Sequence, residues 1–252
     1  MHFRSSLVSS FVYAALAAAC LAPSARAQDR AGSESGMSDG LMPGDYLRIS
    51  GGAATPVNAK GTLRDWGSGQ AVHLLWETWG AGPSGVDIVS FGLGAGYSLL
   101  PFKSDVFVRD FIPTLVSGTR TVSANASNAS VLEITTSFRV RIPAPYIMPH
   151  ISVGLGFMNW HPATIHYTTD AGATGDAKQQ SRSGAEVSIG AGLDKQIYDR
   201  YGLFAEATYA YGLTSFGQGL ATPGNCATTA CNALKNTSIG TIHGGLRVRI
   251  GR

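Results

Sequence analysis

The stretch that decides the fold is VSFGLGAGYSL, residues 89–99. Its odd-numbered positions are all apolar or aromatic, and its even-numbered positions are all Gly or Ser. This period of two is typical of a β-strand, because successive side chains of a strand point to opposite faces of its sheet. The segment is therefore predicted to be a strand with one apolar face and one face of very small residues.

Seven further segments carry the same alternation, which gives eight predicted strands. They cover residues 46–54, 71–79, 133–142, 147–157, 185–193, 203–213 and 238–250. Each is close to the ~9–11 residues that a tilted strand needs to cross a bilayer. Short links at 81–85, 143–145 and 194–200 interleave with long ones at 55–70, 101–132, 161–183 and 215–237. Short turns on one rim and long loops on the other are typical of an outer-membrane barrel.

The volume of the side chains indicates which face meets lipid. Residues as large as Phe91 and Tyr209 occupy the apolar face, and eight strands enclose a lumen only wide enough for side chains to fill. We therefore predict an all-β fold, an up-and-down antiparallel eight-stranded transmembrane β-barrel with small and polar residues inside. Aromatic residues near strand ends, such as Tyr46, Trp79 and Trp160, are expected to form girdles at the membrane interface. A soluble barrel or sandwich with the apolar face inward is the alternative.

Composition excludes several classes of protein. The 252 residues are 44% hydrophobic and only 14% charged, which fits neither a disordered chain nor a charged coiled coil. The formal net charge of +3 is spread along the chain without a Lys/Arg cluster, so no nucleic-acid partner is expected.

The first residues have the pattern of an export signal. Arg4 precedes an apolar run at 7–22, and Ala25-Arg26-Ala27 is the small-x-small sequence that signal peptidase cleaves. We expect residues 1–27 to be a cleaved signal peptide, 28–44 a flexible periplasmic leader and 45–252 the barrel. Lipidation at Cys20 is the alternative.

Two cysteines remain in the mature chain. Cys226 and Cys231 lie in a polar stretch of an exported protein, where a disulfide closing a small loop is expected. A zinc site is the weaker alternative, because the stretch has two thiols and no nearby His.

Parity along the strands places nine charged side chains and three histidines on the lumen face. These are Arg48, Glu77, Glu133, Arg139, Arg141, Glu186, Glu206, Arg247 and Arg249, with His73, His150 and His243. Unpaired buried charges are costly, so the Arg side chains are expected to bridge carboxylates across the lumen. Such a lumen should conduct little or nothing. A proton or ion path along the network is the functional alternative.

The sequence resembles the small eight-stranded outer-membrane β-barrels of the outer-membrane protein A and X type. The resemblance lies in the regular succession of alternating strands, their Gly-rich inner faces and the signal peptide. The last strand also resembles the signal that barrel assembly machinery reads in Gram-negative bacteria, polar-x-Gly-x-x-apolar-x-apolar, at His243, Gly245, Val248 and Ile250. It lacks the usual terminal aromatic residue. The resemblance implies the cell outer membrane as location, with outer-membrane lipids and the assembly machinery as partners.

An enzymatic function is an alternative to a structural one. A lipid-modifying barrel would need a Ser and a His facing lipid, with a carboxylate that orients the His. His161 and His166 lie near Asp170, but no Gly-x-Ser-x-Gly element accompanies them. We expect no catalytic, metal or cofactor residues, and a monomer with a structural or surface-interaction role through its long loops. A narrow pore for small or apolar solutes is the first alternative, and a lipid-modifying enzyme the second.

Overall fold

The computed structural model describes residues 44–57, 61–81, 87–110, 119–142, 144, 146–178, 181–198, 200–213 and 238–250. The predicted signal peptide, nearly all of the leader and both Cys226 and Cys231 lie outside these residues. No helix in the described ranges is long and apolar enough to cross a bilayer.

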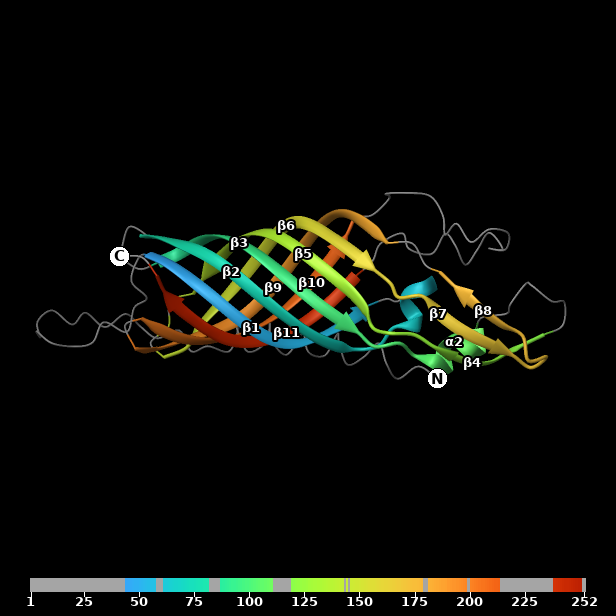
Figure 1. The fold of residues 1–252 in the computed structure, drawn as a ribbon. Coiled ribbons are helices and arrows are strands. Elements are labelled where there is room, and N and C mark those ends of the chain that lie inside the picture. The colour runs from blue at the N-terminus through green and yellow to red at the C-terminus, as the bar shows by residue number, and fades with distance from the viewer. Residues whose placement is uncertain are drawn as a thin grey trace, which may run out of the picture.

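Eight antiparallel strands close into a barrel in the order β1-β11-β10-β9-β6-β5-β3-β2 (Figure 1). Their bounds are β1 Gly44–Val57, β2 Gly69–Ala81, β3 Asp87–Leu100, β5 Ala129–Arg141, β6 Met148–His161, β9 Arg182–Tyr198, β10 Tyr201–Gly212 and β11 Ser238–Arg249. Pairing of β1 with β11, from Tyr46↔Arg249 to Val57↔Ser238, closes the sheet and removes its free edges. The predicted up-and-down eight-stranded barrel is confirmed.

Apolar side chains cover the outside of the barrel. Phe91 is 50% exposed and Leu155 65% exposed, while the glycines between the apolar positions of β3 face inward. An apolar surface that surrounds a whole barrel is far larger than the patches that soluble monomers expose. This belt fits the hydrocarbon layer of a membrane.

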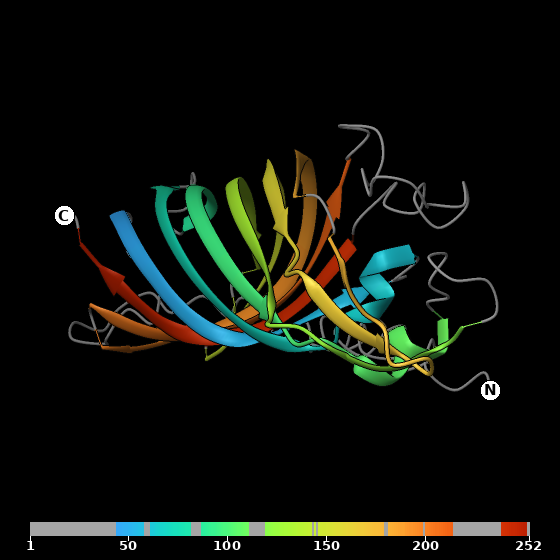
Figure 2. The same ribbon diagram turned by 45° about the vertical axis from the view of Figure 1, so that its right-hand side comes forward.

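The two rims of the barrel differ. The turn rim holds the links β2–β3, β5–β6 and β9–β10, and the loop rim holds the four longer connections. Beyond the loop rim lies the rim extension, made of helix α2 (Ser104–Asp110) and the strands β4 (Thr121–Asn125), β7 (Ile165–Thr169) and β8 (Thr174–Ala177). Its strands form a separate sheet in the order β4-β7-β8 (Figure 2). The predicted loops at 101–132 and 161–183 are therefore partly regular structure.

Several predicted boundaries and part of the predicted girdle are wrong. Strand β1 runs to Val57 and β5 begins at Ala129, inside the predicted loops 55–70 and 101–132. Residues 194–200 were expected as a link, but β9 continues to Tyr198, since the alternation simply runs on into polar residues. The side chains of Tyr46, Trp79 and Trp160 are 1–3% exposed and lie inside the barrel. They belong to the inward rows of their strands, so they fill the ends of the lumen and do not reach the membrane interface.

Candidate functional site: the filled lumen

The lumen is filled in four layers along the barrel axis. Nearest the turn rim lies the base, an apolar cluster of Tyr46, Trp79 and Met148. Above it lies the charge layer, which consists of Arg48, Glu77, Arg139, Arg141, His150, Asp194, Glu206 and Arg247. A polar chamber follows, and an apolar cover closes the loop rim.

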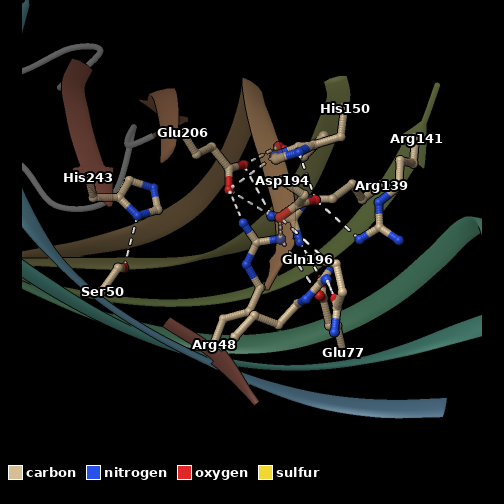
Figure 3. A network of polar contacts seen from close by, with 12 residues as sticks. Arg48, Ser50, Glu77, Arg139, Arg141, His150, Asp194, Gln196, Glu206 and His243 are labelled. Carbon is tan, nitrogen blue, oxygen red and sulfur yellow. Dashed lines mark hydrogen bonds and ion pairs between the residues drawn. The ribbon is translucent and has the colours of Figure 1, made fainter. Parts of the chain in front are cut away.

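Two arginines of the charge layer span the lumen (Figure 3). Arg139 on β5 pairs with Glu77 on β2 and places its Nη2 atom 2.8 Å from Oε2 of Glu206 on β10. Arg48 on β1 lies 3.4–3.6 Å from carboxylate oxygens of Glu77, Asp194 and Glu206. Strands on opposite walls of the barrel are thereby linked through ion pairs.

Asp194 is a second centre of the charge layer. Its Oδ2 atom lies 3.1 Å from Nη2 of Arg141 and 3.1 Å from Nδ1 of His150. Its Oδ1 atom lies 3.4 Å from Nη1 of Arg48 and 3.9 Å from Nη1 of Arg247. The carboxyl group is completely buried, so these partners supply the charge compensation that water would otherwise give.

Aromatic rings hold three of the guanidinium groups. Arg48 stacks over Phe204 at 3.7 Å, Arg141 over Trp79 at 3.5 Å and Arg247 over Tyr46 at 4.8 Å. These cation–π contacts restrict the orientation of each guanidinium group. Because Trp79 and Tyr46 belong to the base, the charge layer rests directly on the apolar cluster below it.

Burial makes this layer sensitive to the loss of any member. Every charged side chain in it is 5% exposed or less, and it combines four arginines and His150 with three carboxylates. Desolvation of such groups is offset only by several good pairings at once. Removing one carboxylate would take a partner away from at least two buried cations.

The chamber lies between the charge layer and the cover. It encloses a cavity of about 90 Å³, lined among others by Glu133, Glu186, His73 and His243. The two imidazole rings stack with their centroids 4.7 Å apart, and Nδ1 of His243 lies 2.9 Å from the hydroxyl of Ser50. The chamber is polar, in contrast to the base and the cover.

The cover consists of inward side chains at the loop rim and of the short helix η1 (Gly61–Asp65). Trp66, which follows η1, packs edge-on against Trp160 and Phe102 with ring centroids 6.1 and 5.5 Å apart. The other buried members are Ala54, Leu63, Ala71, Leu100, Ala129, Val131, Met158, Ala210 and Ile239. Seven of the eight barrel strands contribute at least one of them, so the cover closes the lumen across its width.

The structure separates the nine predicted network residues into three groups. Arg48, Glu77, Arg139, Arg141, Glu206 and Arg247 lie in the charge layer. Glu133 and Glu186 line the chamber above it. Arg249 lies partly exposed at the turn rim, where its amide donates to the carbonyl of Arg200.

Sequence reasoning missed Asp194, Gln196 and Phe204. Asp194 and Gln196 continue the inward row of β9, and this parity would have found them if the strand had been extended beyond residue 193. Phe204 is an apolar residue in an inward row and is 5% exposed. There its ring stacks against Arg48, a contact that strand parity alone does not show.

The residues weighed for catalysis do not meet at one site. The His161 Nδ1 atom lies 2.6 Å from the hydroxyl of Ser181, whereas His166 contacts Asp176. Asp170 accepts a hydrogen bond from the amide of Arg120. The Ser181 hydroxyl and the Asp176 carboxylate therefore contact two different histidines. Within the described part of the chain, no three His, Cys, Asp or Glu side chains form a metal-binding group.

No protein-family model and no curated protein matches the chain. Among solved structures it is similar to Neisserial surface protein A, at 13% identity and TM-score 0.46, over 82% of this chain and 97% of that one. OprG from Pseudomonas aeruginosa matches at 11% identity and TM-score 0.43, over 85% and 99%. Ail of Yersinia pestis, solved with the heparin analogue sucrose octasulfate, matches at 14% identity and TM-score 0.36, over 81% and 99%. These neighbours are small outer-membrane β-barrels.

Proposed function

We propose that this chain is a non-enzymatic integral outer-membrane barrel with a sealed lumen, which acts as a rigid scaffold and meets partners through its loop rim. The observation that carries the proposal is the charge layer. Its arginines reach carboxylates on opposite walls of the lumen, so a solute would have to break several buried ion pairs to pass.

Apolar layers on both sides support this proposal. The base and the cover exclude water from the two ends of the lumen through Trp79 and Trp66, which are 3% and 1% exposed. A hydrated ion would lose its hydration shell at either layer without gaining polar partners, which is costly. Three successive barriers therefore oppose flux.

The rim extension supports a surface role. Phe107 of α2 packs with Ile165 and Tyr167 of β7 in an apolar cluster of its own. A binding surface on loops over a rigid scaffold is a common arrangement, and this cluster gives the loops a fixed shape. The extension is the part of the described structure that we propose to contact partners.

Flux through proteoliposomes tests the sealed lumen. The protein is refolded, its heat-dependent gel migration confirms a folded barrel, and ion and sugar efflux are compared with empty liposomes. A channel-forming peptide added at the end verifies that the vesicles were sealed. We expect efflux equal to that of empty liposomes. Steady efflux from the wild type would overturn the proposal and favour a narrow pore.

The same proposal includes the route to the membrane. We expect cleavage after Ala27, assembly through the segment 243–250 and a Cys226–Cys231 disulfide. Amino-terminal sequencing of the protein from purified outer membranes tests the cleavage site, and a mature chain starting elsewhere than Gln28 would contradict it.

A further inference from the structure

One short segment, the strap, connects the rim extension to the cover. The strap consists of residues 101–110 and includes helix α2. In Figure 2 the cyan helix η1 and the green helix α2 lie at the same end of the barrel. The amide of Gly67 donates to the carbonyl of Pro101, and the amide of Lys103 donates to the carbonyl of Asp65, both at 2.7 Å. The strap therefore holds both ends of a short stretch of the cover through backbone hydrogen bonds.

The ring of Phe102 in the strap packs against both apolar clusters. Phe102 forms a β-bridge with Trp66 of the cover, and its ring centroid lies 5.5 Å from that of Trp66 and 5.7 Å from that of Phe107 in α2. Phe107 in turn packs with Ile165 and Tyr167 of the rim extension. Close-packed interiors have few voids that could absorb a displacement, so they transmit strain from one side chain to the next. Loss of order around Phe107 should therefore reach Trp66.

Polar contacts join the two parts at the ends of α2. The hydroxyl of Ser104, the first residue of the helix, donates to the carbonyl of Ala124 on β4 at 2.7 Å. At the other end, Nη2 of Arg64 in η1 lies 3.0 Å from Oδ2 of Asp110. This ion pair is partly exposed and contributes little by itself. The apolar contacts and the backbone bonds therefore supply most of the link.

We propose that the strap couples the rim extension to the cover, so that the cover loosens when the extension loosens and becomes more ordered when a partner fixes the extension. Two segments open together when each is stabilised by contacts that the other keeps in place. The charge layer takes no part in this link, so the coupling does not require conduction. Its regulatory use rests on the proposed surface role of the extension, but the link itself can be tested without a partner.

Hydrogen exchange in the refolded protein tests the link. Ile165→Ala removes an apolar contact within the extension, and the amides of Gly67 and Lys103 report on the cover. We expect both amides to exchange roughly 2- to 30-fold faster in the variant than in the wild type, the range typical of coupling through packed networks. The amide of Ile142, which is hydrogen-bonded at the turn rim, should keep its rate. This reference separates a loosened cover from a loosened barrel.

Thr168→Ala is the matched control, because Thr168 lies on the same strand but outside the apolar cluster. It should leave the rates of all three amides unchanged. Coupling between two sites is reciprocal, so a change in the cover must also reach the extension. Trp66→Ala should therefore increase the cleavage of Phe107 by chymotrypsin, and unchanged cleavage would contradict the link.

Unchanged exchange of Gly67 and Lys103 in Ile165→Ala would overturn the proposal. Faster exchange of Ile142 by the same factor would also overturn it, because the whole barrel would then have loosened. If Ile165→Ala does not fold, Ile165→Val takes its place and should give the smaller effects of the range. Efflux in the flux test would not alter these rates, so the two proposals fail separately.

Discussion

Asp194 is the residue on which the charge layer depends most. It contacts Arg48, Arg141 and His150 within 3.4 Å from a completely buried position. We predict that Asp194→Asn lowers the free energy of unfolding by about 3–5 kcal/mol, because removing one partner leaves buried cations uncompensated. Urea unfolding in phospholipid vesicles, followed by Trp fluorescence, measures the change.

The control for this prediction is Asp176→Asn. Asp176 forms an exposed pair with His166, and exposed pairs contribute at most about 1 kcal/mol. If Asp194→Asn changed stability no more than this control, the charge layer would not be a major source of stability.

Inward glycines can be tested in the same assay. A Cβ atom on Gly192 would lie 2.7 Å from Cε1 of His150 and would also clash with the carbonyl of Ala205. We predict that Gly192→Ala lowers stability by about 1–3 kcal/mol through overpacking. Gly51→Ala adds a Cβ whose nearest atom is 3.9 Å away, so it should leave stability nearly unchanged. Equal effects of the two substitutions would contradict this account.

Strand parity explains why so much of the lumen was predictable. The alternation in β3 and β5 assigns Gly96, Glu133 and Arg139 to the inside without any knowledge of their partners. Parity cannot tell which inward charges meet. Arg139 reaches Glu206, 67 residues away, while Glu133 lies a few residues along the same strand, above the charge layer, with no such partner. Which inward charges pair depends on their position along the barrel axis and on how the barrel closes. Both are properties of the assembled sheet.

At the level of elements, the cover contains a group with a shifted pKa. Burial is the main cause that raises the pKa of Asp65 to about 7, and Asp110 adds to it, while Arg64 and Lys103 act in the opposite direction. The folded cover therefore keeps a proton that the unfolded segment loses near its ordinary pKa of 3.8. Because the folded state binds more protons in this range, cover stability should fall as pH rises from about 4 to about 7.

Hydrogen exchange measures this effect. The amides of Gly67 and Lys103 donate to the carbonyls of Pro101 and Asp65 in the cover. After correction for intrinsic rates, both should exchange faster above pH 7 than at pH 5. Asp65→Asn, which cannot ionise, should remove the difference. A pH dependence that survives in this variant would assign it to another group.

The rim extension should be able to loosen without affecting the barrel. Ile165 is fully buried against Phe107 and Tyr167, in a cluster that meets the cover through the partly buried Phe102 and Ala126. We predict that Ile165→Ala makes Phe107 accessible to chymotrypsin while the unfolding midpoint of the barrel stays the same. Thr168→Ala on the same strand is the control and should not increase cleavage. A lowered barrel midpoint would show that the extension and the barrel unfold together.

The strands of the rim extension could not be predicted from the sequence. Its strands are only 4–5 residues long, too short for a clear period. Strand β4 pairs with β7 across a gap in the sequence that contains two whole barrel strands. Such pairing exists only because the closed barrel brings the ends of β3, β5, β6 and β9 to one rim.

For the whole molecule, the layers act as barriers in series, and this arrangement predicts how variants combine. Arg139→Ala removes a side chain that joins Glu77 and Glu206 across the charge layer, but the cover still closes the lumen. Trp66→Ala opens the cover, but the charge layer remains. We therefore expect each single variant, refolded in proteoliposomes, to show the same ion efflux as empty liposomes.

The double variant Arg139→Ala/Trp66→Ala should still show the efflux of empty liposomes, provided that its heat-dependent migration shows a folded barrel. In this variant the base is the only remaining barrier, and its Trp79 ring has lost neither Arg141 nor its apolar neighbours. Adding Trp79→Ala opens the base as well and should therefore give measurable efflux. Efflux from Trp66→Ala alone would mean that ion pairs across the lumen do not block passage, because a barrier in series stays closed until every layer is opened.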